Sequence, residues 1–182
     1  FVERFKRGIV PEILSHYGDF SYNPFPADTA YKPLVTNGLL LRVDRAVCED
    51  QIVGTYRGVQ VRALECTASR KEKNESTQVF QGTLVKMPLK REVAGRYRLT
   101  TKKWHHAETG EADEGAWQDI NLESTQFERL FDFEGTDQIE GRTILTPLQI
   151  ERWLAFEKLY DGQPVRAVMA GRNAYIALSH TN

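Results

Sequence analysis

The spacing of hydrophobic residues predicts a helix at the start of the chain, followed by a connector. Residues 1–18 carry an apolar residue at every fourth position, as on one face of an amphipathic helix. Pro11 is expected to kink or break this helix, and Gly18 to end it. Three prolines follow within residues 19–48, which predicts an extended, turn-rich connector.

From residue 49 onward the hydrophobic pattern has a period of two, which is typical of strands. Residues 49–68 predict a hairpin that turns near Arg57 and Gly58. A polar connector is expected at residues 69–77. Two further strands are predicted at 78–87 and 91–101, separated by Pro88, because proline cannot donate to a sheet ladder.

The last third of the chain predicts a strand, a helix and a closing hairpin. Residues 127–134 alternate between two faces, and one face carries the phenylalanines. Thr146, Pro147 and Gln149 indicate a helix start, because threonine caps a helix, proline suits its first position and glutamine completes a capping box. After this helix, we expect a hairpin around Gly171.

Short strands follow one another without intervening helices, and this succession predicts an antiparallel sheet and an α+β fold. We expect about six to eight strands in one domain that spans residues 1–182. Its parts are the N-terminal amphipathic helix (1–18), the extended connector (19–48) and the sheet region (49–182), which contains the helix 147–160 and the closing hairpin.

Composition narrows the class of protein only slightly. Hydrophobic residues make up 41% and charged residues 27%, as in ordinary folded domains. The net charge of −1 gives no overall field that favours nucleic acid, so we expect no nucleic-acid partner. No apolar run approaches the roughly 20 residues that cross a bilayer. Because the chain begins at Phe1, we expect it to be an excised or processed part of a longer protein.

The two cysteines, Cys48 and Cys66, are too few for a disulfide scaffold. A hairpin turn centred on Arg57 places them opposite each other, with Cα atoms about 4.5–5.5 Å apart. A two-residue turn at Arg57 and Gly58 would shift the pairing by one and separate them. We expect neighbouring free thiols in a reducing compartment.

Carboxylates near the end of the predicted strand are the first candidates for chemistry. Asp132 and Glu134 are two residues apart on one face, at a separation of about 6.5–7 Å that suits an acid/base pair. The competing interpretation is a solvated polar face opposite the phenylalanines, which is common in antiparallel sheets. Asp137 and Glu140, spaced by three, fit one exposed helical turn.

Motifs for metals, cofactors and nucleophiles are missing. His105 and His106 lie among acidic residues in the polar stretch 105–116, but the paired spacings of a zinc site are absent. The sequence also lacks phosphate-binding glycine loops and serine or cysteine nucleophile motifs. We therefore expect no cofactor, and nothing positive indicates an enzyme.

A basic stretch is the strongest candidate for binding. Between residues 86 and 103 there is one acidic residue, Glu92, and the stretch predicts a patch for anionic lipid head groups or for an acidic partner protein. The alternative is a solvated sheet face whose long side chains cover apolar surface. The basic residues are Lys86, Lys90, Arg91, Arg96, Arg98, Lys102 and Lys103.

Residues 127–178, FERLFDFEGTDQIEGRTILTPLQIERWLAFEKLYDGQPVRAVMAGRNAYIAL, resemble the C-terminal signature of a bacterial family known as domain of unknown function 3137. Upstream, DQIVGTYRGVQVRALE and FQGTLVKMPL resemble a hairpin and a strand of the same family. Arg62 and Met87 stand where the family is often apolar, and this departure would alter any binding face. The polar positions that fit the signature, and that we expect to form a structural network, are Asp137, Glu140 and Arg142.

The resemblance implies a bacterial protein whose hydrophobic transmembrane segments precede this region. It therefore implies a cytoplasmic domain of an inner-membrane protein, and it implies no activity. The leading hypothesis is a non-catalytic binding or scaffold module near the membrane surface. The alternatives are a hydrolase that uses a pair among Asp132, Glu134, Asp137 and Glu140, and a self-assembly module that forms a homo-oligomer.

Overall fold

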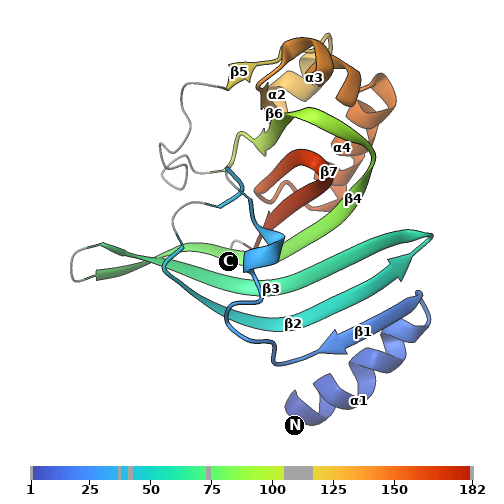
Figure 1. Ribbon diagram of the computed structural model, residues 1–182, viewed down its shortest axis with the longest axis vertical. Helices are drawn as coiled ribbons and strands as arrows, with labels where there is room; N and C mark the ends of the chain where they lie inside the picture. The colour runs from blue at the N-terminus through green and yellow to red at the C-terminus, as the bar shows by residue number, and fades with distance from the viewer. Residues whose placement is uncertain (1, 37, 41–42, 73–74, 105–116, 181–182) are drawn as a thin grey trace.

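In the part of the chain that the structure describes, seven antiparallel strands form one sheet (Figure 1), which confirms the predicted α+β class. The computed structural model describes residues 2–36, 38–40, 43–72, 75–104 and 117–180. The strand order is β1-β2-β3-β4-β6-β5, and β7 pairs with the other side of β4. The elements are α1 (Val2–Ser15), β1 (Asp19–Asn23), η1 (Lys32–Leu34), β2 (Arg45–Tyr56), β3 (Val59–Glu72), β4 (Glu75–Thr101), β5 (Gln118–Asp119), α2 (Thr125–Leu130), β6 (Phe131–Gly135), α3 (Gln138–Ile144), α4 (Pro147–Leu159) and β7 (Val165–Ser179).

Strands β4 and β7 form a long ribbon that joins the two halves of the sheet. The first half of β4 pairs with β3 and the second half pairs with β6, while β7 follows β4 along both halves. The β4–β7 register shifts between Pro88 and Arg96. Such irregularities bend a strand, and the ribbon of β4 curves from the lower sheet up to the helices in Figure 1.

The two faces of this ribbon support two different hydrophobic cores. On one face, Leu64, Leu84 and Trp104 pack with Leu34 and Leu39 of the segment before β2. On the other face, the core consists of Tyr97, Leu99, Phe127, Phe131, Phe133 and neighbouring residues, and α2, α3 and α4 cover it. Successive residues of a strand point to opposite faces, so β4 and β7 contribute to both cores.

Pro88 does not separate two strands as predicted. Residues 75–101 form one continuous strand, β4. Pro88 pairs with Asn173 at the last position before the register shift, and the next paired residue of β4 is Val93. A proline is tolerated beside an irregularity because the ladder is interrupted there.

The polar segment 69–77 is also paired, and the prediction of a connector was wrong there. Strand β3 continues to Glu72, and β4 begins at Glu75. Ser69 pairs with Gln78, and Lys71 pairs with Ser76. The described residues near this tip, such as Lys71 and Ser76, are exposed, so the segment carries no alternation of apolar and polar residues that would reveal a strand.

Phe127 belongs to a helix and not to the predicted strand. The Ser124 side chain accepts a hydrogen bond from the Phe127 amide at 3.3 Å and caps α2. The Glu128 carboxylate also accepts a hydrogen bond from the Leu122 amide at 2.8 Å. Strand β6 therefore begins only at Phe131, because these capping contacts favour a helical turn over an extended chain.

The N-terminal region contains more regular structure than the sequence predicts. Helix α1 passes through Pro11 without a break. Pro11 lies on the exposed side of the helix, where water can satisfy the carbonyl that loses its partner. The predicted connector contains β1, and β2 begins at Arg45 rather than at residue 49.

The β2–β3 hairpin has the two-residue turn, and the two cysteines nevertheless lie opposite each other on the paired strands. Arg57 and Gly58 both have positive φ angles, 49° and 80°, as two-residue hairpin turns require. A bulge at Asp50 then shifts the register, so that Cys48 lies opposite Cys66. Both thiols are buried and free, and burial raises the pKa of Cys66 to about 12.

The C-terminal helix starts where the sequence predicts. The Thr146 side chain accepts a hydrogen bond from the Gln149 amide, and Pro147 occupies the first turn of α4. The segment after the helix is one strand, β7, and not a hairpin. Gly171, with a φ of 56°, lets β7 bend together with β4 instead of reversing.

Candidate functional site

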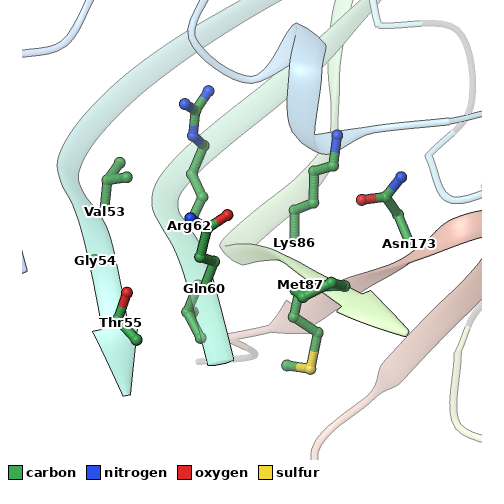
Figure 2. A pocket seen from close by; sticks show the side chains of 10 residues that line it. Val53, Gly54, Thr55, Gln60, Arg62, Lys86, Met87 and Asn173 are labelled. Atoms are coloured by element: carbon green, nitrogen blue, oxygen red, sulfur yellow. The ribbon is translucent and has the colours of Figure 1, made fainter. Parts of the chain in front are cut away.

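A cationic cleft lies on the face of β2, β3 and β4 at the end of the sheet near the β2–β3 turn (Figure 2). Its volume is about 540 Å³, which is within the range of ligand cavities. The polar side chains of Gln60, Arg62, Lys86 and Asn173 line it. We call this site the Arg62–Lys86 cleft.

The sheet register places the two cations side by side. Arg62 of β3 pairs with Lys86 of β4, and Lys86 pairs with Tyr175 of β7. Directly opposite residues have Cβ atoms about 4.5–5.5 Å apart. Figure 2 shows the long side chains of Arg62 and Lys86 extending in the same direction, while that of Met87 extends the opposite way.

No carboxylate neutralises this pair among the residues that the structure describes. Neither Arg62 nor Lys86 takes part in an ion pair within that set. The Lys86 ammonium lies 5.1 Å from the centre of the Tyr175 ring, which offers a weak cation–π contact. Like charges opposite each other on a sheet are destabilising, so an anion bound between them would relieve a repulsion that the fold builds in.

The chemistry of the cleft is that of binding. Its lining includes the amides of Gln60 and Asn173 and the hydroxyl of Thr55, which can donate hydrogen bonds to an anion. It contains no carboxylate, histidine or cysteine, and therefore no ordinary general base or nucleophile. The described residues also contain no cluster of potential metal ligands.

The structure disperses the basic stretch that the sequence presented as one patch. Only Lys86 lines the cleft. Arg98 pairs with Glu134 at 2.7 Å, and Lys102 pairs with Asp132 at 3.3 Å. The remaining members are Arg91, which donates to the Thr143 hydroxyl at 2.6 Å, Arg96, which lies over the Trp117 ring, and the exposed Lys90 and Lys103.

The four candidate carboxylates all have structural partners. Asp132 and Glu134 form the ion pairs with Lys102 and Arg98. Asp137 caps α3 by accepting hydrogen bonds from the Ile139 and Glu140 amides. None of the four lines the Arg62–Lys86 cleft.

Glu140 ties α3 to β4 through three hydrogen bonds. Its carboxylate accepts from the amides of Ala94 and Gly95, at 3.0 and 2.8 Å, and from the Tyr97 hydroxyl at 2.6 Å. These donors, with Tyr97 the strongest, lower the pKa of Glu140. Burial and the neighbouring Glu140 raise the pKa of Tyr97. The Arg142 side chain, in contrast, is exposed and forms no hydrogen bond or ion pair with the described residues.

Two further predictions concern the histidine pair and membrane-spanning segments. The histidines His105 and His106 lie outside the described residues, as does most of their acidic neighbourhood. No helix among the described residues is long and apolar enough to cross a membrane.

Arg62, Gln60 and Asn173 are the cleft residues that motif analysis did not select. Arg62 was marked only as a departure from the apolar residue common in the family. Nothing in the sequence signals that Asn173 reaches the same cleft, because it is 111 positions away from Arg62 and joins it only through the β3–β4–β7 pairing.

Comparison with known proteins agrees with this fold. A family model described as a protein of unknown function (DUF3137) matches residues 78–182, more than half of the chain. The structure is similar to the crystal structure of the mycobacterial trehalose monomycolate transport factor A, TtfA, with a TM-score of 0.57 and 12% identity. That match covers 98% of this chain and 84% of the other, and at this identity it shows the fold alone. No curated protein matches the sequence.

Proposed function

The chain belongs to the DUF3137 family of proteins of unknown function, and we propose that it is a non-catalytic binding module that works beside a membrane. Its ligand carries a phosphate or a carboxylate, which is held between Arg62 and Lys86. We place the module at the cytoplasmic face of a bacterial inner membrane, where the anionic group belongs to a lipid head group.

The observation that carries this proposal is the unneutralised cation pair in an open cleft. Elsewhere on the sheet, Arg98 and Lys102 each have a carboxylate within 4 Å. Arg62 and Lys86 have none among the described residues, although register holds them together. Guanidinium and ammonium groups are the usual ligands of phosphate and carboxylate oxygens.

The exposed apolar side of α1 supports a place beside a membrane. Phe5, Ile9 and Ile13 recur at helical spacing and are 43%, 48% and 50% exposed. Arg4 is exposed on the same helix and can meet anionic head groups. Helices of this kind bind at the membrane interface. The similar fold of the mycobacterial trehalose monomycolate transport factor A is consistent with such a role.

The first experiment measures binding to vesicles of phosphatidylcholine alone or mixed with phosphatidylglycerol, by flotation at low salt. We expect the chain to float with the anionic vesicles, because their head groups carry the phosphate that Arg62 and Lys86 would hold. Arg62→Gln with Lys86→Gln should weaken this binding by about tenfold or more, since charge-assisted contacts contribute about 1.5–3 kcal/mol. Free glycerol phosphate, titrated by calorimetry, reports on the head group without the membrane.

The matched control is Arg57→Gln, which removes an exposed cation from the same hairpin without touching the cleft. Equal loss of binding in the control and the double variant would mean that general charge, not the cleft, holds the membrane. An absence of binding to both anionic vesicles and glycerol phosphate would reject the proposed function. A dimer in solution that dissociates on Ile9→Glu would instead favour self-assembly through α1.

A further inference from the structure

A second site lies between α4 and the β4–β7 ribbon, on the face opposite the Arg62–Lys86 cleft. Two cavities of about 460 and 350 Å³ lie here, and Met87, Gln149, Trp153 and Ile176 line both of them. They therefore adjoin and form one groove, which we call the α4 groove. Met87 and Ile176 each follow by one residue a member of the Lys86–Tyr175 pair, and Lys86 reaches into the cleft, so the side chains of Met87 and Ile176 point to the opposite face.

The floor and wall of the α4 groove are hydrocarbon and aromatic. Val85, Met87 and Ile176 form the floor, while Trp153 and Phe156 of α4 form the wall. These side chains are only partly buried. Partly exposed apolar surface in a concave site favours an apolar ligand. The thioether of Met87 also adapts readily to the shape of a ligand.

The charge at the groove is of one sign. Its lining includes Lys90, Arg91 and Arg152 and contains no aspartate or glutamate. The whole chain, in contrast, has 24 basic and 25 acidic residues. The adjacent acid, Glu92, is paired with Arg172 at 3.2 Å. An apolar groove with a cationic rim is complementary to a molecule with a hydrocarbon chain and an anionic end.

A peptide is a poorer match than a hydrocarbon chain for this floor. A peptide brings amide groups that need hydrogen-bond partners when they are buried. The floor side chains, Val85, Met87 and Ile176, provide none, and the β4 backbone beneath them is already paired with β3 and β7. An acyl chain makes no such demand.

We propose that the α4 groove binds the acyl chain of a monoacyl lipid, with its anionic head group at Lys90, Arg91 and Arg152. Arg91 is positioned for this role by its 2.6 Å hydrogen bond to the hydroxyl of Thr143, which lies in the last turn of α3. The groove shares Met87 and Pro88 with the lining of the cleft, but its cations, Lys90, Arg91 and Arg152, are different from Arg62 and Lys86. This inference therefore goes beyond vesicle binding and does not rest on it.

The experiment uses monomeric fatty acids and no vesicles. Oleate should bind, measured by calorimetry, while acetate and oleyl alcohol should bind much more weakly, because each lacks one of the two complementary parts. Dibromostearate, whose bromine atoms quench tryptophan on contact, should quench the fluorescence of the chain. Trp153→Phe should remove most of that quenching and leave oleate binding within about threefold.

Charge variants test the rim. Lys90→Ala with Arg152→Ala should weaken oleate binding by about three- to tenfold, as expected for the loss of two partly exposed charge contacts. Lys158→Ala is the matched control, because it removes an exposed cation from α4 outside the groove. Ile176→Glu should abolish binding, and circular dichroism checks that this variant is folded.

Three results would overturn the proposal. They are equal affinity for oleate and acetate, full quenching that persists in Trp153→Phe, and oleate binding unchanged by the Lys90 and Arg152 substitutions. Because no membrane is present, failure here leaves the vesicle result of the Arg62–Lys86 cleft intact, and the reverse also holds.

Discussion

The side chain of Glu140 fixes the position of helix α3 against strand β4. It belongs to α3, and its three donors belong to β4 at the end of the register shift. Two of these donors are the backbone amides of Ala94 and Gly95. The irregular part of β4 therefore obtains from Glu140 hydrogen bonds that a sheet ladder would otherwise supply.

Replacing Glu140 by glutamine should lower the free energy of unfolding at pH 7 by about 1–2 kcal/mol, because three charge-assisted hydrogen bonds are weakened. The lowered pKa of Glu140 means that its contribution is complete above the unfolded value of about 4.3 and is lost as the pH falls through the folded value. The difference between the two proteins should therefore shrink below about pH 4.

Urea unfolding at several pH values measures this difference. Glu151→Gln, an exposed change on α4 that removes the same charge, is the control and should have little effect. A pH-independent difference for Glu140→Gln would mean that its carboxylate charge contributes nothing.

At the scale of elements, two registers form the Arg62–Lys86 cleft: strands β3 and β4 place Arg62 opposite Lys86, and the β2–β3 hairpin places Val53 opposite Arg62. Its turn uses Arg57 and Gly58, and the bulge at Asp50 corrects the pairing further along. Without the correct register on β3, Arg62 would move to the other face of the sheet, since a slip of one residue reverses every side chain.

Substitutions at two glycines with open space around them can show the effect of backbone strain without the effect of steric crowding. An added methyl group would meet nothing within 4 Å at either Gly8 or Gly58. Gly58 has a φ of 80°, whereas Gly8 lies within α1. Gly58→Ala should destabilise the protein by about 1–2 kcal/mol, and Gly8→Ala should stabilise it by up to about 1 kcal/mol. The thermal unfolding midpoints of the two variants test this difference, and an equal change in both would contradict the turn geometry.

At the scale of the molecule, the β4–β7 ribbon joins two cores that would otherwise be separate. Leu84 belongs to the core beneath the N-terminal segment, and Leu99 belongs to the core beneath the helices. Both residues lie on β4, and β7 contributes Val168 to the first core and Ala167 to the second. If the β4–β7 ribbon detaches from one core, the other core also becomes exposed to solvent.

We therefore expect one cooperative unfolding transition. Leu84→Ala and Leu99→Ala should each lower its free energy by about 2–5 kcal/mol, as large-to-small changes in cores do. Far-UV circular dichroism and tryptophan fluorescence should report the same midpoint, because Trp104 lies in one core and Trp153 packs against the other. Two separate transitions, each sensitive to only one substitution, would show that the halves unfold independently.

Local chemistry by itself determined several elements of this protein. The capping residues Thr146 and Pro147 located α4, because a cap acts within one helical turn. The glycine beside Arg57 located the hairpin turn, and alternation along the chain indicated an antiparallel sheet. Lys86 could be selected from the sequence as part of the basic stretch, and Arg62 as a departure from the family pattern. Nothing in the sequence predicted that the two residues are neighbours.

Only the tertiary structure decided which residues of distant strands and helices line the same site. The segments at Pro88 and Gly171 were predicted to end strands, yet β4 and β7 continue through them because the two strands bend together. That bend and the β3–β4–β7 register place Asn173 in the same cleft as Arg62, and Met87 in the same groove as Gln149 and Trp153 of α4. Such pairings depend on contacts between residues far apart in sequence, and hydrophobic spacing within one segment carries no information about its distant partner.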